Sequence, residues 1–398
     1  MQNIKLYKHQ ENIIYANPSR YLLAHACGTG KTLTGISLAN KNCQSVLVIC
    51  PKSIKETWIR KMTENSTVPD WIVLSKEEFR RDWNKLKRYD GEIIDEAHYF
   101  SGINSMITKA LIKYNKKWNI KYRWLMTATP YMSTPWNIFT IATHLGYYIS
   151  CASFRAQFFY DINMGGRRVP VIKTGIEDDL KKIVNKIGNT VPLNECVDMP
   201  EQVFEVEYFK PTKEQEKAIS DITDLEHIVK WTKTHQILGG YLTGNEYEVG
   251  RQFECDKLSR IIELATDNDR IIITARYLGE IAMIKEALKD IEKDVYVLNG
   301  ATKDRQDLFD KLKSKKKYVL LVSASVSEGW ELPECPLMVF YSHDFALKNY
   351  IQLQGRISRI SNPKRNVYIS LVVEDSIDED VYKCLDKKED FHLSLYRK

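Results

Sequence analysis

The chain has 398 residues and a net charge of +6, from 58 basic and 52 acidic side chains. This length suffices for two domains of ordinary size, and the mild basic excess permits a polyanionic partner without requiring one. The eight cysteines form no C-x-x-C pair, which argues against a zinc site or a disulfide framework and favours free thiols in a reducing compartment. No apolar run reaches about 18 residues and no signal-peptide core is present, so we expect a soluble, cytoplasmic protein with no membrane contact.

The first predicted strand, Tyr21–Ala24, leads directly into His25-Ala26-Cys27-Gly28-Thr29-Gly30-Lys31-Thr32. A strand, a glycine-rich turn and a helix start form a cradle for nucleotide phosphates, because glycines let consecutive N–H groups point at phosphate oxygens. The backbone of Gly28, Thr29 and Gly30 would hold the phosphates. Lys31 would reach the β- and γ-phosphates, and the Thr32 hydroxyl would ligate Mg²⁺. His25 replaces the usual first glycine, so a flexible glycine-rich turn is the alternative.

The acidic residues that such a loop requires follow a later strand. After strands at Ser45–Cys50 and Trp71–Leu74, the segment Glu92–Asp95 leads into Asp95-Glu96-Ala97-His98. Carboxylates at the C-terminal end of a strand lie where open α/β sheets bind ligands. Asp95 would hold Mg²⁺ through water, and Glu96 would orient and deprotonate the water that attacks the γ-phosphate. An acidic strand end that caps the next helix is the alternative. Together with the loop, the two carboxylates predict an NTPase.

Strands alternate with helical segments in both halves of the chain. The first half closes with Trp124–Thr127, and the second half has strands at Arg270–Thr274, Val295–Leu298, Tyr318–Ser323, Met338–Tyr341 and Val367–Val372. This alternation predicts an α/β fold with two doubly wound parallel sheets. We expect an N-terminal ATP-binding domain over residues 1–150, a helical connection over 151–200 and a C-terminal domain over 201–398.

A pair of arginines stands near the end of the second half, in Gln352-Leu353-Gln354-Gly355-Arg356-Ile357-Ser358-Arg359. Arg356 and Arg359 are three residues apart and so share one helical face. Such a pair can reach the γ-phosphate of a nucleotide bound by another domain, where it would neutralise developing charge. A surface helix with exposed arginines is the alternative.

The ordered set of motifs resembles the superfamily 2 helicases and translocases, in particular the Swi/Snf-type DNA motors. In the first half the resemblance runs through Leu6–Gln10 (the Q motif), His25–Thr32 (motif I), Cys50–Ser53 with Thr57-Trp58 (motif Ia), Asp95–His98 (motif II, a DEAH box) and Trp124–Pro130 (motif III). In the second half it runs through Arg270–Arg276 (motif IV), Ser323–Leu332 (motif V) and Gln352–Arg359 (motif VI). Motif I of this family commonly lacks the first glycine, whereas Ser327 departs from the glycine usual in motif V.

The resemblance implies two RecA-like domains in tandem with an ATP cleft between them, and ATP with Mg²⁺ as the bound groups. Gln10 would recognise the adenine, and Gly329 and Glu331 of motif V would also contact the nucleotide. Arg356 and Arg359 would be arginine fingers, and His98 would connect the nucleotide and nucleic-acid sites. The nucleic-acid backbone would be held by Lys52, Ser53, Arg276, Ser323 and Ser325. Trp330 would stack on a base, with a packed side chain as the alternative.

The implied function is an ATP-dependent translocase or helicase that acts, as a monomer, on forked or branched DNA in replication, recombination or repair. In lacking long insertions, the chain resembles compact phage or prokaryotic members of the family. This resemblance implies that the protein acts in the cytoplasm of a bacterial or phage-infected cell. Contacts to phosphates would make binding independent of sequence. An RNA-dependent ATPase and an ATP-gated clamp without processive movement remain the alternatives.

Overall fold

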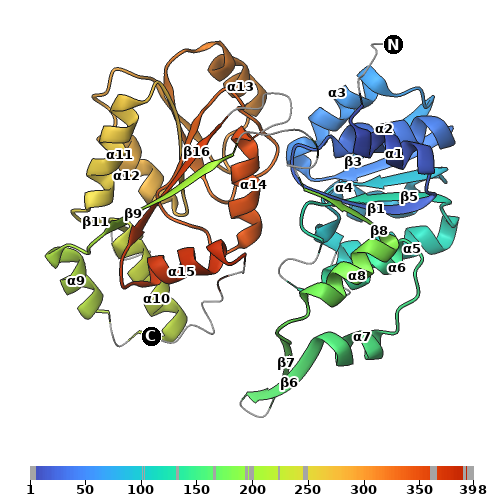
Figure 1. The fold of residues 1–398 in the computed structure, drawn as a ribbon, viewed down its shortest axis with the longest axis horizontal. Helices are drawn as coiled ribbons and strands as arrows, with labels where there is room; N and C mark the ends of the chain where they lie inside the picture. Colours follow the sequence, from blue (N-terminus) through green and yellow to red (C-terminus); the bar gives the residue numbers. More distant parts are fainter. Residues whose placement is uncertain are drawn as a thin grey trace. The chain divides into compact units, whose positions relative to one another are not determined.

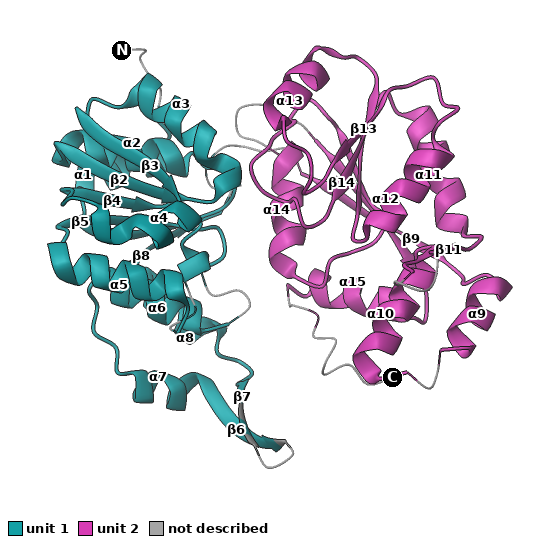
Figure 2. Cartoon of the chain, turned by 180° about the vertical axis from the view of Figure 1, so that it is seen from behind, with its two compact units in different colours: residues 1–198 teal, residues 199–398 magenta. Residues whose placement is uncertain are grey.

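The computed structural model describes residues 6–100, 102, 104–130, 134–164, 167–192, 196, 201–222, 225–244, 250–358, 365–388 and 391. The chain divides into two compact units, residues 1–198 (unit 1) and 199–398 (unit 2) (Figure 2). The segment 151–198, expected as a connection, therefore folds with unit 1. None of the helices in these described ranges is long and apolar enough to cross a membrane.

Unit 1 is built on a six-stranded parallel sheet in the order β3-β2-β4-β5-β1-β8. Its strands are β1 (Arg20–His25), β2 (Ser45–Cys50), β3 (Asp70–Ser75), β4 (Gly91–Ile94), β5 (Tyr122–Met126) and β8 (Gly188–Val191). Its helices are α1 (Lys8–Ala16), α2 (Lys31–Asn42), η1 (Lys52–Ile54), α3 (Lys55–Asn65), α4 (Lys76–Asp82), η2 (Trp83–Lys85), η3 (Ala97–Phe100), α5 (Met106–Trp118), α6 (Trp136–His144), α7 (Cys151–Phe158) and α8 (Glu177–Ile187). A two-stranded antiparallel hairpin, β6 (Phe159–Met164) and β7 (Arg167–Ile172), extends away from this sheet (Figures 1 and 2).

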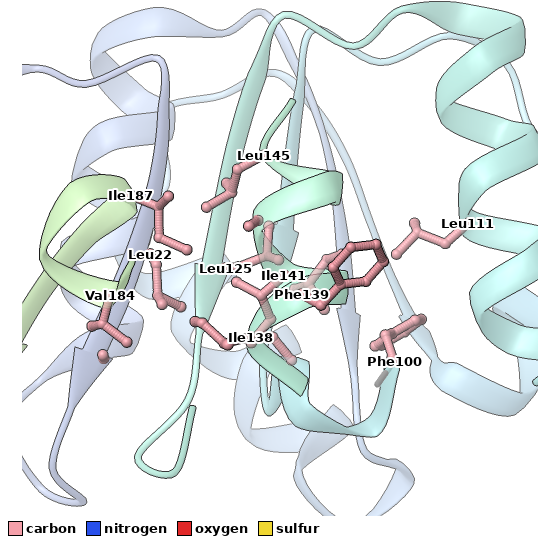
Figure 3. Close-up of a cluster of buried hydrophobic side chains, with 14 of the residues drawn as sticks. Leu22, Phe100, Leu111, Leu125, Ile138, Phe139, Ile141, Leu145, Val184 and Ile187 are labelled. Atoms are coloured by element: carbon pink, nitrogen blue, oxygen red, sulfur yellow. The ribbon is translucent and has the colours of Figure 1, made fainter. Parts of the chain in front are cut away.

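The two faces of this sheet carry separate hydrophobic cores, because successive side chains of a strand point to opposite faces. Leu23 and Trp124 face α1, α2 and α3, and pack with Ile36 and Met62. Their strand neighbours Leu22 and Leu125 face α5, α6 and α8, where they pack with the side chains shown in Figure 3. Burial on both faces explains why the strands read as continuous apolar runs rather than alternating ones.

Unit 2 repeats this architecture with a six-stranded parallel sheet in the order β13-β14-β12-β15-β16-β9. Its strands are β9 (Val203–Phe209), β12 (Arg270–Ala275), β13 (Val295–Leu298), β14 (Tyr318–Ser323), β15 (Leu337–Phe340) and β16 (Val367–Val373), with a short antiparallel pair, β10 (Tyr241–Leu242) and β11 (Arg251–Gln252). Its helices are α9 (Lys213–Ser220), α10 (His227–Leu238), α11 (Asp256–Asp267), α12 (Leu278–Ala287), α13 (Arg305–Ser314), α14 (Leu347–Ile357) and α15 (Ile377–Asp386). Helices α11 and α12 cover one face of the sheet, and α13 and α14 pack on the other.

These two sheets confirm the predicted α/β fold with doubly wound parallel sheets. All ten predicted strands are present, within one residue or two at each end. Two sheet strands were not predicted, β8 and β9, and each lies at an edge of its sheet.

Candidate functional site

The glycine-rich loop of unit 1 joins the end of β1 to the start of α2. Gly28 and Gly30 have φ angles of +84° and +82°, in the left-handed region that favours glycine. The Lys31 ammonium group lies over the loop and donates to the carbonyl oxygens of His25 (2.8 Å) and Ala26 (3.0 Å). The Thr29 hydroxyl donates to the Ala26 carbonyl at 2.9 Å. The tight turn before the N-terminus of α2 is a geometry that suits an anionic phosphate.

His25, the residue in place of the first glycine, is a core residue of the sheet. Its side chain is fully buried, and its Nε2 lies 2.9 Å from Oδ1 of Asn189 on the neighbouring strand β8. Burial lowers the pKa of His25 to about 4, so the ring is neutral at pH 7. His25 therefore anchors the phosphate loop to β8, an edge strand that sequence reasoning missed.

Gln10 is buried against the same loop. Its amide nitrogen donates to the Gly30 carbonyl (3.0 Å) and the Thr34 hydroxyl (3.2 Å), and its amide oxygen accepts from the Tyr7 backbone N–H (2.9 Å). A Cβ added at Gly30 would lie 2.6 Å from Nε2 of Gln10, so no other residue fits there without movement. The structure thus gives Gln10 a loop-holding role, and its recognition of adenine stays a prediction.

The acidic residues after β4 lie close to the loop because β5 alone separates β4 from β1 in the sheet. Asp95 is buried; its Oδ2 accepts from the Trp58 indole N–H (2.8 Å) and its Oδ1 from the Glu96 backbone N–H (2.9 Å). Burial, and next the charge of Glu96, raises the pKa of Asp95 to about 6. Glu96 has a φ of +50°, a backbone conformation that is uncommon for residues other than glycine. Such strained backbone conformations are found most often at functional sites.

A short hydrogen-bonded chain links the acidic motif to the end of β5. His98 Nδ1 lies 3.2 Å from a Glu96 carboxylate oxygen and 3.0 Å from the Thr127 hydroxyl. The same hydroxyl accepts from the Thr129 backbone N–H at 3.1 Å. His98 therefore connects motif II to motif III. Its expected connection of the nucleotide and nucleic-acid sites stays a prediction.

The residues around Asp95 fit a magnesium ion that binds together with nucleotide phosphates. No group of three or more His, Cys, Asp or Glu side chains in the described part of the chain could hold a metal alone. Mg²⁺ commonly uses one or two carboxylates, waters and substrate phosphates rather than an all-protein cage. Asp95 and the half-buried Thr32 would supply the oxygen ligands, and the ion would supply charge neutralisation at the phosphates.

The predicted nucleic-acid contacts of unit 1 are exposed. Lys52 and Ser53 lie in η1, at the C-terminal end of β2, with both side chains open to solvent. Trp58, in the same motif, is buried, and its indole holds Asp95. No motif indicated this contact, because it joins residues 37 positions apart.

In unit 2, Arg276 follows the end of β12 and is paired with the Asp344 carboxylate. Its guanidinium group also lies 3.7 Å from the centre of the Phe345 ring. Ser323 and Ser325, at the end of β14, lie 2.9 Å apart through their hydroxyl oxygens; Ser323 is buried and Ser325 is exposed. Arg276 therefore has an intramolecular anionic partner, which the sequence pattern did not indicate.

The prediction that Trp330 stacks on a base is corrected by the structure. The side chain is 4% exposed, its ring stacks on Phe309, and its indole N–H donates to the Val326 carbonyl at 2.8 Å. A base could reach this ring only after the core opened. The neighbouring Gly329 has a φ of +84°, which gives the turn its shape, and Glu331 is exposed.

Arg356 lies in the last turn of α14 and is 7% exposed. Its Nε donates to the Gln352 carbonyl and one terminal nitrogen donates to the Trp330 carbonyl, both at 2.9 Å. The arginine thus ties motif VI to motif V within unit 2. The second predicted finger, Arg359, lies outside the described residues.

Comparison with known proteins agrees with the motifs. The family model "Helicase conserved C-terminal domain" matches residues 255–361. A probable chromatin-remodeling complex ATPase chain of Oryza sativa is 22% identical over 94% of this chain, and an uncharacterized ATP-dependent helicase of Mycoplasma genitalium is 22% identical over 93%. Residues 255–361 therefore match the helicase C-terminal domain, and the chain as a whole is similar to Swi/Snf-type superfamily 2 helicases. The chain spans 39% of the length of each of these two curated relatives.

Solved structures are similar to this chain in fold. The SWI2/SNF2 ATPase core of Sulfolobus solfataricus in complex with dsDNA aligns over 96% of this chain and 91% of its own, with a TM-score of 0.44 and 21% identity. The Hef helicase domain of Pyrococcus furiosus aligns over 96% of this chain and 98% of its own, with a TM-score of 0.56 and 14% identity. The likeness to the Hef domain and the two six-stranded parallel sheets identify two RecA-like domains in tandem.

Unit 1 has one further feature that was not predicted from the sequence. A pocket beside motif II is lined by Lys76, Arg80, Tyr99 and Met106, among others, with the Lys76 ammonium 3.2 Å from the centre of the Tyr99 ring. These residues follow the ends of β3 and β4, the sheet edge at which α/β proteins bind ligands. Lys76 and Arg80, which follow the predicted strand Trp71–Leu74, were the sequence feature that could have indicated this pocket.

Proposed function

We propose that this chain is an ATP-driven motor that hydrolyses ATP to move along and remodel forked or branched DNA. The observation that carries the proposal is that the phosphate loop, Asp95–Glu96 and Thr127 lie at the ends of three adjacent strands in unit 1. His98 joins Glu96 to Thr127. The match to the helicase C-terminal domain and the likeness to ATP-dependent relatives support ATP hydrolysis as its chemistry. DNA as the substrate is supported by the basic charge, by the exposed Lys52 and by the Swi/Snf-type motifs.

In the proposed reaction, ATP is the substrate and its phosphates lie in the loop before α2. Lys31 neutralises charge on the β- and γ-phosphates. Asp95 and Thr32 would hold Mg²⁺, which would supply further charge neutralisation there. Glu96 accepts the proton of the water that attacks the γ-phosphate, and the nearby His98 holds its carboxylate. Arg356 of unit 2 stabilises the charge that develops in transfer. His98 and Thr127 pass the change at the γ-phosphate to motif III.

The proposal is tested by measuring ATP hydrolysis with single-stranded DNA, duplex DNA, forked DNA, four-way DNA and RNA, with Lys31→Ala as the blank. We expect the strongest stimulation with forked or four-way DNA, and displacement of a bound third strand from duplex DNA as evidence of movement. Stimulation by RNA alone would replace the DNA motor with an RNA-dependent ATPase. Stimulation by DNA without strand displacement would favour an ATP-gated clamp.

A further inference from the structure

A continuous chain of side-chain contacts runs through unit 2 from Arg276 of motif IV toward Arg356 of motif VI. Arg276 pairs with one carboxylate oxygen of Asp344, and the Asn349 side-chain amide donates to the other. Asn349 lies in the first turn of α14, whose last turn carries Arg356. The Asp344 carboxylate therefore joins a predicted nucleic-acid contact to the helix of a predicted catalytic arginine.

Ser327 continues the chain where the family usually has a glycine. Its hydroxyl oxygen lies 3.0 Å from Oδ1 of Asn349 and 2.8 Å from Oε1 of Gln352. One hydroxyl has one proton, so Ser327 donates to one of these two amide oxygens at a time. The backbone carbonyl of Gln352 accepts from Arg356 Nε at 2.9 Å. Since Ser327 and Gln352 are buried, solvent cannot replace these contacts at no cost.

A phosphate could compete with the Asp344 carboxylate for the Arg276 guanidinium. The Arg276 backbone N–H donates to the Ser342 hydroxyl at 2.8 Å, which fixes the root of the side chain. The guanidinium and carboxylate side chains are 24% and 20% exposed, so an outside anion can reach them. Nε of Arg276 is buried, so an outside phosphate would bind the terminal nitrogens of the guanidinium group. One of these nitrogens pairs with Asp344, so the phosphate and the carboxylate would compete for it.

We propose that Asp344 is an internal competitor for the Arg276 guanidinium, and that Asn349 and Ser327 are positioning residues that report its release to Arg356. When a nucleic-acid phosphate binds the Arg276 guanidinium, the Asp344 carboxylate loses its cationic partner and is repelled by the phosphate. Asp344 then moves away, and the Asn349 side-chain amide loses its hydrogen-bond acceptor. Ser327 and Gln352 then change partners, and the backbone that holds Arg356 shifts with them. This inference rests on the proposed nucleic-acid-dependent function, and it adds the residues through which unit 2 senses the backbone.

The first test measures the affinity of the full chain for fluorescent duplex and forked DNA. Asp344→Asn removes the competing charge, so we expect about 3- to 10-fold tighter binding, the range in which partly exposed charge pairs act. The salt slope should stay unchanged, because the wild-type chain already makes the same phosphate contact through Arg276. Asp269→Asn is the matched control, because it removes the same charge at the opposite end of β12, where Asp269 pairs with Lys317 on the surface.

The double variant Arg276→Ala/Asp344→Asn should bind no more tightly than Arg276→Ala alone. Weaker or unchanged binding by Asp344→Asn would overturn the inference, since it would make Asp344 an orienting partner of Arg276 or a bystander. In that case DNA binding by the wild-type chain would leave the proposed function standing. Absence of DNA binding by the wild-type chain would overturn both.

The second test asks whether the signal passes through Ser327. Ser327→Ala removes one atom and should leave DNA affinity within about twofold, but it should lower DNA stimulation of ATP hydrolysis by about 10-fold, the range of typical coupling energies. Asn349→Ala should give a similar loss, and the two together should lose no more than either alone, because residues of one network are not additive. Additive losses, or full stimulation in Ser327→Ala with an unchanged melting temperature, would overturn the relay.

Discussion

The acidic motif of unit 1 and motifs V and VI of unit 2 are held by different kinds of hydrogen bond. In unit 1 they stand at the ends of adjacent strands, and Asp95, Glu96 and His98 bond to one another's side chains or to Trp58 and Thr127. In unit 2, Arg356 and Trp330 bond instead to backbone carbonyls of their own unit. The difference shows that a residue of a motif can serve to hold the backbone of a loop in shape, and not only to contact a ligand.

The largest effect should come from the chemistry assigned to unit 1. Glu96→Gln keeps the shape of the side chain but cannot accept a proton, so ATP turnover should fall by about 10²–10⁴-fold. Binding of a fluorescent ATP analogue should change little. Turnover near that of the wild type would mean that Glu96 is not the general base and only caps the segment after β4. Unit 1 would then hold this motif residue for structure alone, as unit 2 holds Trp330.

Arg356→Ala tests whether unit 2 combines chemistry with structure. As an arginine finger, Arg356 should slow turnover by at least about 10²-fold on removal. Because the Trp330 carbonyl would also lose a buried donor, unfolding of the variant should need about 1–3 kcal/mol less. Arg356→Lys keeps the charge and is the control. A stability loss with normal turnover would make Arg356 structural only.

The pH dependence of folding should reveal His25 in unit 1. Its pKa in the folded state is lowered to about 4 from an ordinary 6.5, so the unfolded chain binds a proton that the folded chain does not. The contribution of His25 is fully present above pH 6.5 and falls as the pH drops toward 4, by at most about 3 kcal/mol. In chemical denaturation without nucleotide, His25→Gln should show a smaller loss over this window. An equal loss in both proteins would contradict the assignment.

The smallest effect should come from Trp330 in unit 2. Trp330→Phe keeps the stacking on Phe309 but loses the hydrogen bond to Val326, which should cost about 1 kcal/mol of stability. Affinity for single-stranded DNA should not change. A weaker affinity of several-fold at unchanged stability would restore base stacking as the role of this side chain.

The sequence predicted the core of the fold because buried parallel strands are continuous apolar runs with turn residues at their ends. It missed β8, whose four residues, Gly188–Val191, include only one strongly apolar side chain and pair with a strand about 165 positions earlier. The loop and acidic residues of unit 1 were brought together as expected because strand ends define that edge of the sheet. The burial of Trp330 and Arg356 was not predictable from their motifs, because it depends on packing against Phe309 and on a bond between segments 26 residues apart.

The position of β8 decides how this protein can be cut into pieces. A fragment that ends at residue 150 would lack both β8 and the Asn189 amide that holds His25. Strand β1 would then become the edge of the sheet, directly before the phosphate loop, with a row of unpaired backbone groups. Such a fragment should aggregate or exchange strands between copies. A fragment that ends at residue 198 keeps β8 and therefore keeps β1 paired on both sides. Limited proteolysis for domain mapping should accordingly yield the longer piece.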